Sequence, residues 1–111
     1  MTTFDERERA FEAMFAHDEE MRFRAQARRG KLLAAWACER MGLYGRDADD
    51  YVRSVMTAMI AGKGIETLAQ EVRQDLEAAG ASADIAEVEP TLVTLTARAA
   101  AEVRNEGQAG R

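Results

Sequence analysis

The sequence predicts an all-α protein: a four-helix bundle that carries a projecting N-terminal arm, helical or partly disordered. Apolar residues recur at helical spacing in four successive segments, glycines separate these segments, and none shows the sustained alternation that marks a strand. The connections are about four to six residues long, as between antiparallel neighbours in a bundle. A chain of 111 residues fits one domain with a modest core. We assign residues 1–20 to the arm, residues 21–104 to the bundle and residues 105–111 to a disordered tail.

The first segment runs from Phe4 to Met41 without a proline. The Thr2-Thr3 pair offers an N-cap, and Gly42 is a natural C-cap. As one helix, this segment would be about 57 Å long at a rise of 1.5 Å per residue. A domain of this size has a radius of gyration of only about 13 Å. We therefore expect part of the helix to project, to fray or to bind another protein.

The second and third segments are shorter amphipathic helices. The second is expected to start near Asp47, a good N-cap, and to end at Gly62. The third is expected to run from Ile65 to Ala79 and to stop at Gly80.

The fourth segment keeps helical spacing from Ile85 to Val103, but it contains Pro90. Ser82 and Asp84 compete as its N-cap. Because an interior proline removes a backbone hydrogen bond, the helix either starts only near Glu89 or kinks at Pro90. We favour the kink, because apolar residues on both sides of the proline are in phase.

Charge and hydropathy exclude several classes of function. Hydrophobic residues make up 47% and charged residues 32% of the chain, and the net charge is −5. A basic cluster lies between Arg22 and Lys31, but the overall balance is acidic and no reading motif appears, so nucleic-acid binding is not predicted. No apolar stretch approaches the roughly 20 residues of a membrane span, and none resembles a secretory signal. We expect a cytoplasmic protein that does not insert into a membrane.

The residues that would carry catalysis or metal binding are scattered. The single cysteine, Cys38, is expected to be a buried, inert thiol, and the single histidine, His17, lies 21 positions away from it. No cluster of histidines and cysteines could complete a metal site, and the glycines at 62 and 64 lack the spacing of a phosphate-binding loop. We predict no catalytic, cofactor-binding or metal-binding residue and no enzyme.

The arm carries three aromatic residues, Phe4, Phe11 and Phe15, at a spacing that places them on one helix face. They either fold back as core or serve as anchors of a helix that binds in a partner's groove. We favour the second interpretation, because a four-helix core of this size has little room for three more rings.

The N-terminal sequence from Phe4 to Asp18, FDERERAFEAMFAHD, resembles the signature of the ATPase inhibitor subunit zeta family. The resemblance continues through Phe23, the Ala27-Arg28-Arg29 run, Lys31-Leu32-Leu33, Trp36 and Met41-Gly42-Leu43, and it is weaker beyond residue 43.

This resemblance implies a small helical inhibitor of ATP hydrolysis that acts on the F-type ATP synthase of α-proteobacteria. The N-terminal segment of such proteins wedges into a catalytic α/β interface beside the central stalk, so the implied partners are the α, β and γ subunits. The enzyme would hold the inhibitor at the periphery of the inner membrane. The residues that match the inhibitory segment, and that we expect to contact the partner, are Phe4, Arg7, Glu8, Phe11, Glu12 and Phe15.

Two other functions stay open at this stage. A small nucleotide-binding or nucleotide-sensing module could use Arg28, Arg29 and Lys31 together with Trp36. A helical adaptor could use the same aromatic face on a different target. Isolated chains could also self-associate weakly through that face.

Overall fold

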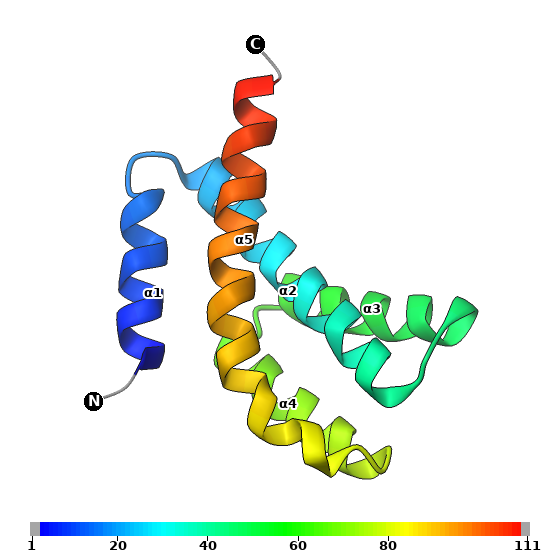
Figure 1. Cartoon of the computed structure of the whole chain (residues 1–111). Helices are drawn as coiled ribbons and strands as arrows, with labels where there is room; N and C mark the ends of the chain where they lie inside the picture. Colours follow the sequence, from blue (N-terminus) through cyan, green and yellow to red (C-terminus); the bar gives the residue numbers. More distant parts are fainter. Residues whose placement is uncertain (1–2, 110–111) are drawn as a thin grey trace.

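The computed structural model describes the backbone of residues 3–109 and the side chains of residues 5–107. Within this range every regular element is a helix, which confirms the predicted all-α class (Figure 1). The elements are α1 (Thr3–Met14), α2 (Glu19–Met41), α3 (Gly45–Ile60), α4 (Ile65–Ala78), the 3-10 helix η1 (Ser82–Glu87) and α5 (Val88–Ala109).

Helix α2 lies at the centre of the fold and packs against α3, α4 and α5. Its buried apolar side chains, Leu33 and Ala37 among them, join the largest core cluster, to which α4 and α5 also contribute. A smaller cluster of Ala34, Val55 and Leu68 links α2 to α3 and α4. The helices that were predicted for the bundle therefore do share a core around α2.

The expectation of one long helix from Phe4 to Met41 is wrong. Helix α1 ends at Met14, and Asp18 begins α2 as its N-cap. The Asp18 carboxylate accepts a hydrogen bond from the backbone N–H of Met21 at 3.0 Å. A capping aspartate followed by two glutamates in the positive first turn is a helix start, and it outweighs the helical spacing that continues across it.

The glycine boundaries are confirmed at the other end of α2. Gly42 has a φ of 74°, and its N–H donates to the carbonyl of Glu39, so it is the predicted C-cap. Helix α3 starts at Gly45, two residues before the expected Asp47, and α4 starts at the expected Ile65.

The predicted kink at Pro90 is also wrong. The segment begins as the 3-10 helix η1, and α5 starts at Val88, so Pro90 is the third residue of its helix. The first four N–H groups of a helix have no intrahelical acceptor, so a proline there removes no hydrogen bond. The alternative of a helix start near Glu89 was the correct one.

The prediction of a disordered tail at residues 105–111 is wrong for residues 105–109, because α5 continues to Ala109. Residues 110 and 111 lie outside the described residues, as does Thr2 of the expected N-terminal cap.

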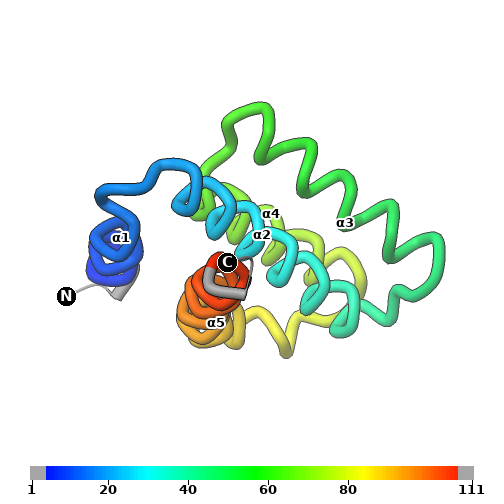
Figure 2. Tube along the Cα trace, turned by 90° about the horizontal axis from the view of Figure 1, so that it is seen from above, coloured from blue at the N-terminus to red at the C-terminus, as the bar shows by residue number. Residues whose placement is uncertain are grey.

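The arm does not project from the bundle. Helix α1 lies alongside α5, on the side of α5 away from α3 (Figures 1 and 2). The described chain measures 43 × 37 × 23 Å along its principal axes, with a radius of gyration of 14.2 Å. Contrary to the expectation, the arm lies against the bundle, because the break before Asp18 allows the chain to turn back.

Candidate functional site

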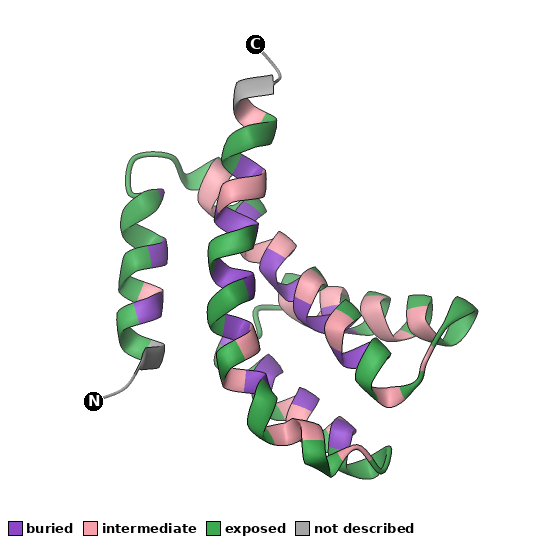
Figure 3. Cartoon of the chain, in the orientation of Figure 1, coloured by how far each residue is buried: buried purple, intermediate pink, exposed green. Residues whose placement is uncertain are grey.

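One face of α1 is buried against the bundle (Figure 3). Arg7, Phe11 and Phe15 are 8%, 1% and 3% exposed. They are spaced four residues apart, so they follow each other along the same side of the chain. This buried face is the face that carries most of the predicted partner contacts.

The two phenylalanine rings form a small core of their own. They pack edge to face, with ring centroids 5.8 Å apart and an interplanar angle of 78°. Ala25 of α2 and the pair Ala100 and Val103 of α5 complete the cluster. Burying a phenylalanine side chain contributes about 1.5–3 kcal/mol, so this cluster is the main apolar contribution to the docking of α1.

The six predicted partner residues have different environments in the structure. Arg7, Phe11 and Phe15 are buried, Glu8 is partly buried, and Glu12 is exposed. The side chain of Phe4 lies outside the described residues. The expectation that Phe11 and Phe15 stay uncovered is wrong in the chain by itself, because α5 presents small residues against which they fit.

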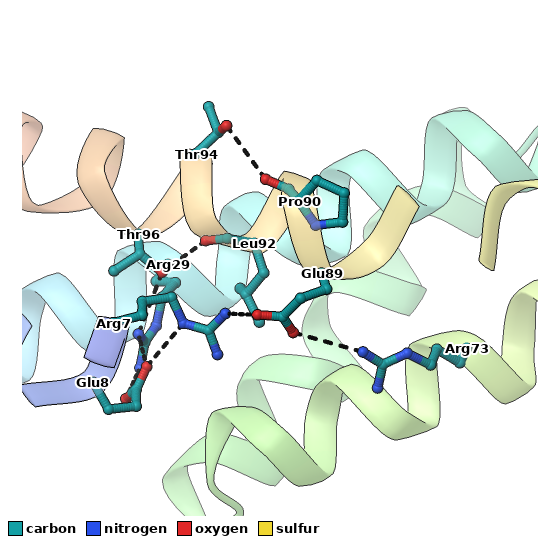
Figure 4. A network of polar contacts seen from close by, with 9 residues as sticks. All are labelled: Arg7, Glu8, Arg29, Arg73, Glu89, Pro90, Leu92, Thr94 and Thr96. Carbon is teal, nitrogen blue, oxygen red and sulfur yellow. Dashed lines mark hydrogen bonds and ion pairs between the residues drawn. The ribbon is translucent and has the colours of Figure 1, made fainter. Parts of the chain in front are cut away.

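Glu8 joins α1 to α2 through a bidentate ion pair (Figure 4). The Arg29 guanidinium donates to the Glu8 carboxylate from Nη1 to Oε2 at 2.7 Å and from Nη2 to Oε1 at 3.0 Å. Arg29 also lies over the Phe11 ring, 4.3 Å from its centroid, and Nη1 donates to Thr96 Oγ1 at 3.4 Å. Only 4% of the Arg29 side chain is exposed, so solvent screens this pair weakly.

Arg7 joins α1 to the first turn of α5. Its Nη1 donates to the Glu89 carboxylate, and its Nε donates to Glu8 at 3.2 Å. Glu89 also pairs with Arg73 of α4 at 3.7 Å. Figure 4 shows these ionic side chains as one chain of contacts from α2 through α1 to α5 and α4. We call Arg7, Glu8, Arg29, Arg73 and Glu89 the ionic network.

Arg29, Arg73 and Glu89 are the members of this site that the sequence-based interpretation missed. The signal for Arg29 was present: it falls between Ala25 and Leu33, both fully buried, at intervals of four residues. A charge on the buried stripe of a helix requires a partner. Glu89 gave no such signal, because its role depends on where α5 begins.

The basic cluster of the nucleotide-binding hypothesis is divided in the structure. Arg29 is paired with Glu8, while Arg28 donates to Glu102 and Glu106 of α5, and Lys31 is exposed. These cations do not converge on one site, so no observation favours that hypothesis.

A surface cavity of about 480 Å³ lies beside the Glu8–Arg29 pair. Its walls are mostly apolar and include the exposed Phe23 and Ile60, with Lys63 at the turn between α3 and α4. This composition does not resemble a phosphate cradle, which uses converging N–H groups and cations.

Cys38 is buried, as predicted, with 4% of its surface exposed. Burial, and then the charge of Asp49, raise the pKa of the Cys38 thiol, which favours the unreactive protonated form.

Among the described residues, no helix is both long enough and apolar enough to cross a membrane.

No curated protein and no solved structure shows a significant match to the chain. The family model of ATPase inhibitor subunit zeta matches residues 1–102, which is nearly the whole sequence and includes α1, the ionic network and most of α5. The family's name indicates an inhibitory subunit of an ATPase, a regulatory role rather than a catalytic one. The chain therefore belongs to the ATPase inhibitor subunit zeta family.

Proposed function

We propose that this protein inhibits ATP hydrolysis by the F-type ATP synthase, with its N-terminal helix as the inhibitory element. Helix α1 inserts into a catalytic α/β interface beside the central stalk and blocks rotation in the hydrolytic direction. The observation that carries the proposal is the family match over residues 1–102, a range that includes the segment proposed to inhibit.

The construction of α1 supports this mechanism. It is an amphipathic helix of 12 residues: Arg7 and Phe11 are buried on one face, and most of its other charged side chains are exposed. Such a face can enter a partner's groove through anchors spaced three or four residues apart. Aromatic and arginine side chains also supply most of the binding energy in protein interfaces. We expect Phe4, Arg7, Glu8, Phe11, Glu12 and Phe15 to make these contacts.

The connection between α1 and α2 also supports it. Residues 15–18 form a short turn, and apart from Phe15 their side chains are exposed. Helix α1 could leave α5 by rotations in this turn while α2 and its partners keep their packing.

Inhibition by a wedge requires no chemistry on the inhibitor. The inhibitor has to bind one rotational state of the enzyme better than the others, because only differential affinity shifts a conformational equilibrium. Synthesis turns the stalk the other way and should be little affected. The protein would reside at the cytoplasmic side of the inner membrane, held there by the enzyme.

Deletion of residues 1–18 tests the proposal. ATP hydrolysis by membranes that contain the F-type ATP synthase should be inhibited by the full chain and not by the truncated chain, while ATP synthesis stays nearly unchanged with both. Deletion of residues 108–111, at the other terminus, is the control and should preserve inhibition. Circular dichroism should show that both variants remain helical. Equal inhibition by the chain without residues 1–18 would refute the proposed role of α1.

A further inference from the structure

We propose that the docked position of α1 is an autoinhibited state, and that Arg29 and Glu89 are the latch that maintains it. The inference rests on the proposed function and adds a regulatory step to it. Before α1 can bind the enzyme, it must leave α5 and break its ion pairs with the bundle.

Docking on the bundle and the proposed binding to the enzyme require the same face of α1. The side chains proposed to contact the enzyme include Arg7, Phe11 and Phe15, and these are the ones the bundle buries to 8% exposed or less. A side chain that is enclosed between α1, α2 and α5 cannot at the same time fill a cleft in another protein. Docking and inhibition therefore exclude each other.

Ionic contacts add specificity to the docking of α1. Apolar packing alone tolerates small shifts, whereas a bidentate arginine–carboxylate pair fixes distance and orientation. Arg29 binds both the carboxylate of Glu8 and the face of the Phe11 ring, at 2.7 Å and 4.3 Å respectively. Glu89 holds Arg7 and is itself held by Arg73 of α4. Two buried or partly buried contacts, one to α2 and one to α5, thus hold α1 at the adjacent residues Arg7 and Glu8.

The latch residues, Arg29 and Glu89, lie outside α1. A substitution at Arg29 or Glu89 can therefore change the strength of docking without changing the sequence of the inhibitory segment. If only a fraction of the molecules is undocked, the apparent dissociation constant for the enzyme equals the intrinsic constant divided by that fraction. Weakening the latch should make the protein a better inhibitor, whereas damage to the inhibitory surface would make it a worse one.

The substitution Arg29→Met tests this inference on the full-length protein. Methionine keeps an unbranched apolar stem but removes the guanidinium and, with it, both hydrogen bonds to Glu8. The concentration that half-inhibits ATP hydrolysis should fall by about tenfold, because more molecules have α1 free.

Arg28→Met is the matched control. Arg28 is the neighbouring residue on α2, and it pairs with Glu102 and Glu106 of α5; among the described residues, neither of these partners belongs to α1. Its substitution should leave the half-inhibitory concentration within about twofold of the wild-type value, because α1 stays latched.

Amide hydrogen exchange reports on docking without the enzyme. Exchange in residues 5–14 should be faster in Arg29→Met than in the wild type, while exchange in α4 is unchanged. Glu89→Gln is a second variant, at a less buried position, and should show the same change in α1 to a smaller extent. It keeps the test decisive if Arg29→Met does not fold.

The outcomes separate the latch from the proposed function. If wild-type protein does not inhibit hydrolysis at all, the proposed function fails. If the wild type inhibits but the variants release α1 without a gain in potency, docking is not autoinhibitory. If α1 exchanges at the wild-type rate in both variants, the ionic network is not a latch.

Discussion

Gly30 lies where α2 and α3 pack together, and its missing side chain makes room for a methionine. A Cβ atom at this position would lie 2.0 Å from the Sδ atom of Met59. Helix α2 continues through Gly30 without interruption, although glycine in a helix interior costs about 1 kcal/mol relative to alanine. The close approach of Met59 explains why a glycine is suited to this place.

Tyr51 provides a residue-scale prediction about stability at high pH. Its hydroxyl donates to the Asp75 carboxylate at 2.8 Å. Burial, and then the hydrogen bond to Asp75, raise the pKa of Tyr51 above its ordinary value. The folded state thus binds a proton that the unfolded state releases first, so this stability is complete below about pH 10 and is lost as the pH rises beyond it.

Tyr51→Phe should lower the free energy of unfolding at pH 8 by about 1 kcal/mol, the usual net value of one hydrogen bond. The difference from the wild type should shrink as the pH rises from about 10 to about 12, as measured by urea unfolding. Tyr44→Phe is the control, because the Tyr44 side chain is exposed. Wild-type and Tyr51→Phe curves that run parallel over this pH range would disprove the role of Tyr51.

At the scale of the element, α5 accommodates a proline because it starts only two residues before it, at Val88. Pro90→Ala should therefore change the free energy of unfolding by no more than about 1 kcal/mol, because no backbone hydrogen bond is gained. Ala97→Pro, at an exposed interior position of the same helix, should cost about 3 kcal/mol or more. Thermal unfolding of both variants checks the pair. A large stabilisation by Pro90→Ala would mean that the proline strains α5.

Helices α1 and α2 show what periodicity can and cannot predict. The apolar spacing correctly identified both as helical, and it placed Phe11 and Phe15 on one face. It could not show the break between them, because a cap depends on one local side chain, Asp18, and not on the repeat. The same limit applies to α5. The apolar residues before Pro90 keep the helical spacing, so the spacing could not show where α5 starts.

At the scale of the whole molecule, the fold class and the helical regions of the bundle could be predicted from the sequence, and the docking of α1 could not. Whether the rings of Phe11 and Phe15 are buried depends on two small residues far along the chain. These residues, Ala100 and Val103, must lie opposite the rings. The family signature correctly indicated an ATPase inhibitor subunit, but it carries no information about where the helix rests in the free protein.

The molecule that results has one helix with two competing binding sites, its own bundle and the proposed cleft in the enzyme. The bundle acts as a stable base, with α2 at its centre, and α1 is joined to it by a short turn. Inhibition on this account is an exchange of α1 between the two sites.

A thiol placed under α1 measures this exchange most directly. Ala100 is fully buried in the cluster with Phe11 and Phe15, so Ala100→Cys in a Cys38→Ala background puts a single thiol beneath the docked helix. Its rate of alkylation, followed by mass spectrometry, should be slow in the free protein and should rise at least about tenfold in the inhibited enzyme complex, because α1 has left α5. A thiol that stays protected in a fully inhibited complex would contradict the account, since α1 would then inhibit without leaving its own bundle.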